Sequence, residues 1–231
     1  MANKLTQRFE MLVGQDSIHV LRDKRVIVFG VGGVGGQAAE SLVRSGIGHI
    51  TIVDRDIVDE TNINRQVVAL VSAIGKVKVD VLKSRLLDIN PLLDINAING
   101  ELTRETLGNF GLDNYDFIVD AIDSVKDKIA LIEYCYHQNL PLISSMGAGN
   151  RLDPTAVYIT DIFKTSYDPL AKVIRAHLRK NNIEKLSVVT SEEAPKKTSG
   201  KTPSSSPFVP PAFGLAIASY VTRKLLMYNI K

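Results

Sequence analysis

A glycine-rich turn near the start of the chain has the residue types and the spacing of a phosphate-binding loop. Gly30, Gly32 and Gly35 form a Gly-x-Gly-x-x-Gly pattern that follows a β-rich run at residues 25–29. Glycines let the backbone turn tightly and come close to phosphate oxygens, and the N-terminus of a following helix offers free N–H groups. We therefore expect a nucleotide site at this turn, with Gly33 as a further contact.

An acidic residue stands where a nucleotide-binding fold needs one. Asp54 lies 24 residues after Gly30, at the end of the next β-rich run, where it can accept hydrogen bonds from a ribose. This fingerprint does not separate NAD from ATP, and alone it favours a dehydrogenase. A P-loop is excluded because Gly36-Gln37 stands where Gly-Lys-Ser/Thr is required.

Three further groups of polar residues favour phosphate chemistry over hydride transfer. They are Asn62-x-x-Arg65-Gln66 just after Asp54-x-Asp56, Lys78, and Asp123-Ser124. Transfer of an adenylyl group needs cations on the phosphates, which Arg65 and Lys78 would supply. It also needs a carboxylate for magnesium, a role that suits Asp123. Alone, the two cations would be surface charges and Asp123 a helix N-cap, so the prediction depends on the combination.

The elements that must position these residues alternate between strands and helices. We expect strands at 25–29, 49–53, 94–98, 116–122 and 140–144, and helices at 37–45, 76–89, 127–138 and 168–181. This alternation predicts an α/β, Rossmann-like fold with a mostly parallel sheet and helices on both faces. The C-terminal part would add the basic helix, a mobile Ser-, Pro- and Lys-rich loop at 190–207, and an apolar docking helix near 213–221.

Composition limits the class of protein. A chain of 231 residues suits one large domain, and its single cysteine, Cys135, excludes an internal disulfide and a four-thiolate zinc site. The N-terminal residues have no signal-peptide h-region, and the apolar stretch at 213–221 is shorter than the roughly 20 residues of a membrane span. We therefore expect an intracellular, cytoplasmic protein without stable membrane insertion.

Positive charge is concentrated in the second half of the chain. Residues 164–201 contain nine Lys and Arg against four acids, a net charge of +5, whereas the whole chain carries +3. Such a segment would neutralise phosphates and support salt-dependent RNA binding. An ordinary solvated basic helix is the alternative, and His177 has no spacing typical of a metal site.

Several motifs together resemble the ThiF/MoeB superfamily of ubiquitin-activating-enzyme-like adenylating enzymes. They are GVGGVG at 30–35, IVDRD at 52–56, TNINRQ at 61–66, Lys78, and DAIDS at 120–124. The resemblance covers roughly residues 8–150 and implies ATP and Mg²⁺ as cofactors, an acyl-adenylate product and a homodimer. It also implies a catalytic role for Arg8, because an N-terminal arginine in these dimers reaches the partner subunit's ATP. We expect a single adenylating domain over 1–231, with its nucleotide-binding core at 8–150 and a substrate-facing extension at 151–231.

The second half is similar to the branch of this superfamily that dehydrates threonylcarbamoyladenosine in tRNA. The similarity is carried by the segments at 119–135, 147–155 (GAGNRLDPT), 164–180 (KTSYDPLAKVIRAHLRK), 191–195 and 208–221. That branch cyclises the modified adenosine next to the anticodon, with net loss of water and cleavage of ATP. The resemblance thus implies tRNA as the partner, and it leaves a monovalent-cation site open.

The chain departs from its relatives in having few thiols. It lacks the paired CxxC motifs for zinc and the loop cysteine linked to sulfur traffic, so we do not expect sulfur-traffic partners. Cys135 falls on the apolar face of its predicted helix, where a thiol is inert. The cyclisation needs no enzyme thiol, because an intramolecular nucleophile can reach effective molarities of about 10⁵ M or more.

Three alternative functions remain open from the sequence. The first is adenylation of the C-terminus of a ubiquitin-like sulfur-carrier protein, the second a nucleotide-binding module without chemistry, and the third an NAD(P)-dependent oxidoreductase. The presence of Arg8, Arg65, Lys78 and Asp123 disfavours the module.

Overall fold

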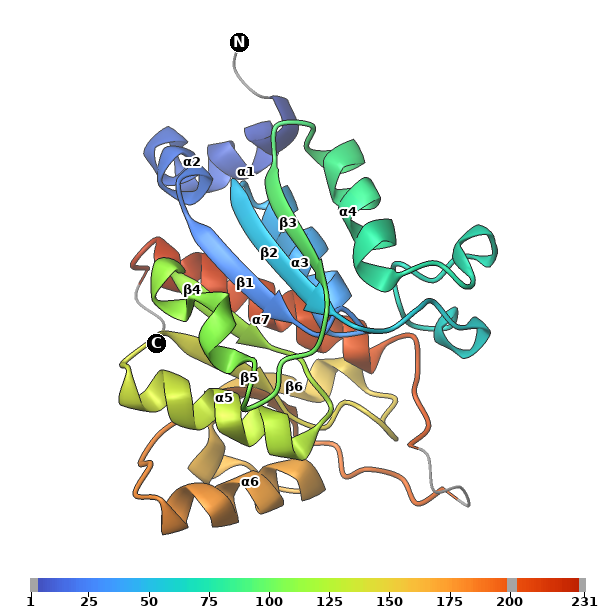
Figure 1. The fold of residues 1–231 in the computed structure, drawn as a ribbon, viewed down its shortest axis with the longest axis vertical. Coiled ribbons are helices and arrows are strands. Elements are labelled where there is room, and N and C mark those ends of the chain that lie inside the picture. Colours follow the sequence, from blue (N-terminus) through green and yellow to red (C-terminus); the bar gives the residue numbers. More distant parts are fainter. Residues whose placement is uncertain (1–3, 199–202, 229–231) are drawn as a thin grey trace.

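A seven-stranded sheet forms the centre of the protein in the computed structural model, which describes residues 4–198 and 203–228 (Figure 1). The strand order is β3-β2-β1-β4-β5-β7-β6. All neighbouring strands pair in parallel except β6 and β7, which are antiparallel. The predicted Rossmann-like, mostly parallel α/β fold is therefore confirmed.

The first half of the chain builds the sheet as expected from its hydrophobic runs. The strands are β1 (Arg25–Phe29), β2 (His49–Asp54), β3 (Asp94–Asn99), β4 (Phe117–Asp120) and β5 (Leu142–Ser145). The helices between them are α3 (Gly35–Arg44), α4 (Lys78–Ile89) and α5 (Val125–His137). The predicted elements are all present, with boundaries that differ by up to two residues from those expected.

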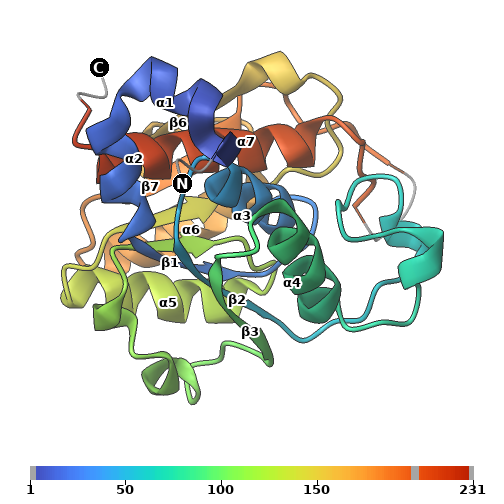
Figure 2. The same ribbon diagram turned by 90° about the horizontal axis from the view of Figure 1, so that it is seen from above.

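Helices cover both faces of the sheet. Val26 and Val28 of β1 point into a core shared with α3, α4 and α7 (Val209–Leu225), whereas Ile27 and Phe29 point into the core under α5. Figure 2 shows α7 and α5 on opposite sides of the sheet. This alternation follows from the period of two in a strand and gives the sheet an apolar surface on each side.

The second half differs from the sequence prediction in two strands. Neither β6 (Val157–Asp161) nor β7 (Ser187–Ser191) was expected, whereas the predicted basic helix is present as α6 (Pro169–Lys180). The assignment of residues 190 and 191 to a mobile loop is wrong, because Thr190 pairs with Tyr158 and Ser191 with Val157 in the sheet. Residues 192–198 and 203–207 form no helix or strand, while 199–202 lie outside the described residues, and the mobility of this loop stays a prediction.

The two ends of the described chain pack near each other. The short helices α1 (Gln7–Val13) and α2 (Gln15–Arg22) were not predicted, and Tyr228 Oη donates a hydrogen bond to Val13 O at 3.2 Å. The C-terminal docking helix α7 is longer than expected and lies directly on α3, where Gly214 permits the contact: a Cβ there would lie 2.4 Å from Val34 O. Among the described residues, none of the helices is long and apolar enough to cross a membrane.

Candidate nucleotide and catalytic site

A cavity of about 400 Å³ opens at the carboxyl ends of β1, β2 and β4. This is the edge of an open α/β sheet at which ligands bind. Its lining includes eleven of the residues predicted from the sequence: Gly30, Gly32, Gly33, Asp54, Asp56, Asn62, Arg65, Gln66, Lys78, Asp123 and Ser124. The tertiary structure thus brings together side chains that lie up to 94 positions apart in the chain.

The glycine turn has the backbone geometry that the sequence pattern requires. Gly30 has φ +82°, and a Cβ at this position would lie 2.6 Å from Ala121 O, so only glycine fits there. Gly35 is not among the lining residues, although it was expected to bind the cofactor. A Cβ on Gly35 would lie 1.8 Å from Gly30 O, so this glycine allows α3 to start directly against the turn.

Asp54 shapes the turn as well as facing the cavity. Its Oδ2 accepts a hydrogen bond from Val31 N at 2.7 Å, and its Oδ1 accepts one from Asp56 N at 2.8 Å. The carboxylate therefore holds the glycine turn against the end of β2. Each oxygen can accept more than one hydrogen bond, so a contact with a ribose stays compatible with this geometry.

The two predicted phosphate-binding cations are held in different ways. Lys78 is buried, with only 6% of its side chain exposed, and its Nζ lies 2.8 Å from Asp56 Oδ2. Arg65 donates from Nη1 to Thr61 O at 2.8 Å and to Asn64 Oδ1 at 2.9 Å. Both cations are thus oriented at the cavity wall by neighbouring residues of the 56–65 segment.

Two amide side chains of the same segment are buried. Asn62 accepts a hydrogen bond from Asp59 N at 3.2 Å and completes a reciprocal cap with the Asp59 side chain. Gln66 is 8% exposed, and its Oε1 has no hydrogen-bond partner among the residues that the structure describes. A buried polar atom without a partner is costly, so Gln66 offers the cavity an acceptor for a ligand N–H or O–H group.

Asp123 and its neighbour Ser124 have different contacts at the acidic end of the site. Ser124, not Asp123, caps α5: its Oγ accepts from Asp127 N and donates to Asp127 Oδ2 at 2.5 Å. Asp123 is exposed and forms no hydrogen bond or ion pair with any residue that the structure describes. Its carboxylate is therefore available to a ligand. In the described ranges, no group of three His, Cys, Asp or Glu side chains is placed to hold a metal ion.

A fully buried polar cluster under Asp123 was missed by sequence reasoning. Lys128 Nζ lies 2.8 Å from Asp120 Oδ1, and Ser144 Oγ donates to Asp120 Oδ2 at 2.5 Å. Asp120 Oδ1 also accepts from Ile122 N at 3.2 Å, so the cluster fixes the turn that carries Asp123. The available signal was Asp120 itself, a charged residue inside an otherwise apolar strand.

The rim of the cavity includes residues from distant parts of the chain. Arg55 and Glu101 form an ion pair there, and Ala148, Gly149, Ser205 and Pro210 come from the second half. Asn64 Nδ2 donates to Ser205 O at 2.9 Å and so ties the segment before α7 to the Arg65 segment.

Arg8 does not line this cavity. It lies exposed on α1, whose neighbour Thr6 packs against Gly46 near the amino ends of the strands. Arg8 is therefore not brought together with the other predicted catalytic residues within one chain. Its action on a partner subunit's ATP stays a prediction.

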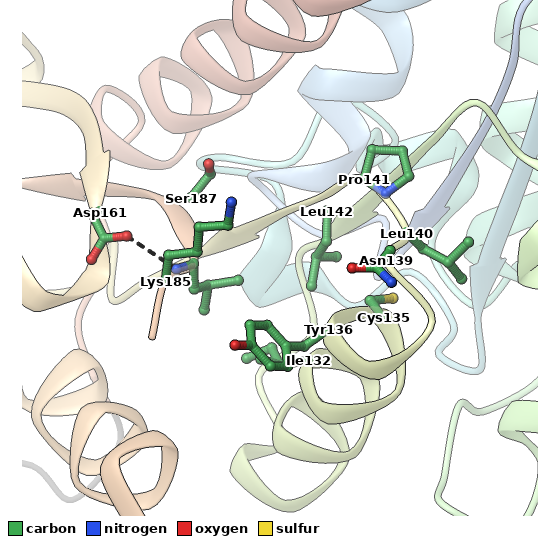
Figure 3. Close-up of a pocket in the computed structure, with 11 residues that line it drawn as sticks. Ile132, Cys135, Tyr136, Asn139, Leu140, Pro141, Leu142, Asp161, Lys185 and Ser187 are labelled. Carbon is green, nitrogen blue, oxygen red and sulfur yellow. Dashed lines mark hydrogen bonds between the residues drawn. The ribbon is translucent and has the colours of Figure 1, made fainter. Parts of the chain in front are cut away.

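The single cysteine, Cys135, lies outside the nucleotide cavity. Figure 3 shows Cys135 beside Leu140 and Tyr136 at a second cavity, of about 380 Å³, near the start of β5. The residue is 1% exposed, and burial raises the pKa of its thiol to about 12. The expectation of a buried Cys135 is confirmed, and its lack of reactivity stays a prediction. None of the predicted site residues lines this second cavity.

Comparison with known proteins identifies relatives along almost the whole chain. The model of the ThiF family matches residues 6–230. The tRNA threonylcarbamoyladenosine dehydratase of Bacillus subtilis is 43% identical over 95% of this chain and 93% of its own length. The protein of the same name from Escherichia coli is 40% identical over 79% of this chain and 71% of its own. A molybdopterin-synthase adenylyltransferase from Haemophilus influenzae is 30% identical over 71% of this chain and 66% of its own.

The fold is also similar to solved structures. The E. coli tRNA N6-threonylcarbamoyladenosine dehydratase in complex with AMP superposes with a TM-score of 0.91 at 34% identity, covering 96% of this chain and 93% of that one. The same enzyme in complex with ATP gives a TM-score of 0.90 at 35% identity, covering 96% and 95%.

Proposed function

Because this chain belongs to the ThiF family of adenylating enzymes, we propose that it dehydrates N6-threonylcarbamoyladenosine in tRNA at the expense of ATP. The observation that carries the proposal is the 43% identity to a dehydratase of that name over nearly the full length of both chains. The adenylyltransferase relative is less similar and matches a shorter part of the chain, which disfavours the sulfur-carrier alternative.

The cavity fits ATP in size and in its donors and acceptors. A volume of about 400 Å³ lies in the range of small-molecule sites. The glycine turn with Gly30, Gly32 and Gly33 lines the cavity, and the unpartnered Gln66 Oε1 offers an acceptor. We assign the phosphates to Gly30, Gly32 and Gly33, the ribose to Asp54, and further polar contacts to Asn62, Gln66 and Ser124.

The first chemical step is attack of the substrate's threonyl carboxylate on the α-phosphate of ATP, which releases pyrophosphate. Arg65 and Lys78 would offset the negative charge that develops on the phosphates. Lys78 is buried, and its partner Asp56 is largely exposed, so the cation is oriented in advance of ligand binding. Mg²⁺ would be held by Asp123 together with phosphate oxygens and would neutralise charge on the leaving pyrophosphate.

The second step is cyclisation within the substrate. The carbamoyl group attacks the activated carbonyl carbon, the bond from that carbon to the AMP oxygen breaks, and the carbamoyl group loses a proton. One carboxylate oxygen leaves with AMP, so the modified adenosine loses the elements of water. The buried Cys135 takes no part, because an intramolecular nucleophile held in place needs no covalent enzyme intermediate.

We further infer a homodimer in which Arg8 enters the partner's cavity. Met11 and Leu12, on the same helix as Arg8, are 82% and 79% exposed, and such apolar surface favours association. A second subunit would complete a site that lacks Arg8 in one chain. Action on tRNA would place the enzyme in the cytoplasm.

The test is mass spectrometry of nucleosides from tRNA that carries threonylcarbamoyladenosine, after incubation with the protein, ATP and Mg²⁺. We expect a product lighter by one water, and no product with the Asp123→Ala variant. Pyrophosphate exchange that needs a carrier protein and ignores tRNA would contradict the proposal and support the alternative.

A further inference from the structure

Tyr167 has an unfavourable backbone conformation that its own side chain does not explain. Its φ is +54°, a region that bulky L-residues rarely adopt, and its side chain is 67% exposed. Its hydroxyl forms no hydrogen bond with another described residue, and its ring forms no aromatic or cation–π contact with one. Strain at an exposed residue persists only where the surrounding structure imposes it, and such residues cluster at functional sites.

A buried ion pair imposes this conformation. Arg151, 2% exposed, donates from Nη2 to Tyr167 O at 3.2 Å, and its Nη1 lies 3.7 Å from Asp168 Oδ2. Asp168, 4% exposed, caps α6 through Ala171 N at 3.0 Å and accepts from Gly147 N at 3.0 Å. The backbone on both sides of Tyr167 is thus fixed from inside the protein, while the ring projects into solvent.

The same contacts connect the backbone next to Tyr167 with a segment that lines the nucleotide cavity. Asp168 binds Gly147, and the next two residues, Ala148 and Gly149, line that cavity. The exposed Lys164 and Lys172 flank the tyrosine in sequence, and neither side chain forms an ion pair within the described part of the chain. An exposed aromatic ring with exposed lysines close by in the sequence matches the chemistry of single-stranded RNA, whose bases stack on aromatic rings and whose phosphates attract lysines.

We propose that Tyr167 stacks on an unpaired base of the substrate RNA, next to the nucleotide whose carboxylate enters the cavity. Lys164 and Lys172 contact the phosphates on either side of that base. This inference rests on the proposed function, since it takes the substrate to be an RNA loop. It assigns to Tyr167 the positioning of the loop, and no part in ATP binding.

The test compares the full-length wild type with Tyr167→Phe and Tyr167→Gly, with Leu92→Ala, an exposed apolar residue just before β3, as the control. The dissociation constant for tRNA carrying threonylcarbamoyladenosine is measured by fluorescence anisotropy, that for ATP by calorimetry, and the melting temperature by circular dichroism. We expect Tyr167→Gly to weaken tRNA binding roughly 5- to 150-fold, the fold-change that corresponds to the loss of one stacked base. Tyr167→Phe should bind tRNA within about twofold of the wild type, because a phenyl ring still stacks. The control Leu92→Ala should also bind within about twofold, because it leaves Tyr167 in place.

The glycine variant also separates a binding role from a structural one. Glycine adopts positive φ without strain, so the melting temperature should be unchanged or raised while tRNA affinity falls and ATP affinity stays the same. If the wild type dehydrates its tRNA but Tyr167→Gly has an unchanged tRNA affinity or a lower melting temperature, the inference about Tyr167 is overturned and the proposed function stands. A wild type that neither binds nor dehydrates this tRNA would overturn the proposed function and this inference together.

Discussion

Two aspartates three positions apart have opposite environments at the end of β4. Asp120 is fully buried and bound to Lys128 and Ser144, whereas Asp123 is exposed and forms no hydrogen bond or ion pair with a described residue. A buried carboxylate that is neutralised by a lysine serves to hold the backbone, and an unpaired one at a cavity can serve a ligand. The position of Asp123 at the cavity therefore depends on the buried Asp120, which holds the backbone of the same turn.

Replacing Lys128 by methionine should leave Asp120 buried with two neutral donors, Ser144 Oγ and Ile122 N, and no counterion. We expect the free energy of unfolding to fall by about 3–5 kcal/mol, because the remaining charge has lost its counterion. Urea denaturation monitored by circular dichroism measures the change. The double variant Asp120→Leu with Lys128→Met should recover part of the loss. An unchanged unfolding midpoint in Lys128→Met would show that the ion pair contributes nothing.

Cys135 should be chemically silent in the folded protein. Burial raises the pKa of its thiol to about 12, so almost no thiolate forms near pH 8. We expect iodoacetamide to label the thiol only after unfolding, and Cys135→Ala to retain the rate of pyrophosphate exchange within about twofold. Rapid labelling of the native protein, measured by mass spectrometry, would contradict this assignment.

At the scale of elements, ion pairs between charged side chains connect α3 to α4 in addition to their apolar contacts. Glu40 of α3 lies 2.6 Å from Arg85 of α4 and 2.9 Å from Arg44 on its own helix, and its side chain is 8% exposed. Burial alone would raise the pKa of Glu40, but hydrogen bonds from Arg85 and Arg44 lower it below its ordinary value of 4.5. The Glu40–Arg85 ion pair thereby helps to fix the position of α4, which carries Lys78, against α3.

The stability that Glu40 provides should depend on pH. Because its pKa is lower in the folded state, the stabilisation is present above about pH 4.5 and is lost as the pH falls through the folded value. Glu40→Gln should therefore reduce the free energy of unfolding by about 1–3 kcal/mol at pH 7 and much less at an acid pH below the lowered pKa of Glu40. Denaturation curves at both pH values test this, and an equal difference at both would contradict it.

At the scale of the whole molecule, one sheet and one cavity join the two halves of the chain. β7 lies between β5 and β6, so the segment after residue 150 extends the same sheet instead of forming a separate unit. The nucleotide cavity likewise combines the glycine turn with Gly149, Ser205 and Pro210. This continuity supports the prediction of a single domain over 1–231, with the division at about residue 150 kept as a prediction.

The proposed dimer can be tested by mixing two inactive variants. Arg8→Ala removes the group that would act on the partner, and Asp123→Ala inactivates the subunit's own cavity. In a mixed dimer, one of the two cavities has both residues, so equal amounts after subunit exchange should restore about a quarter of the wild-type dehydration rate. Each variant alone serves as the control. If the mixture stays inactive although mixed dimers are detected by native mass spectrometry, Arg8 does not act across the interface.

The sequence by itself determined the features that depend on a few neighbouring residues. Hydrophobic runs and glycine positions predicted the strands β1 to β5, the turn at Gly30, and the placement of Asp54 and Asp123 at strand ends. These features follow from strand periodicity and turn stereochemistry, which act over short stretches of chain.

Only the tertiary structure decided which distant groups meet. It brought Lys78 to Asp56 and Lys128 to Asp120, inserted β7 beside β5, and left Arg8 outside the cavity of its own chain. It also forced Tyr167 into a positive φ through Arg151 and Asp168. Such pairings depend on burial and packing summed over the whole chain, and no local pattern around Tyr167 or Lys128 encodes them.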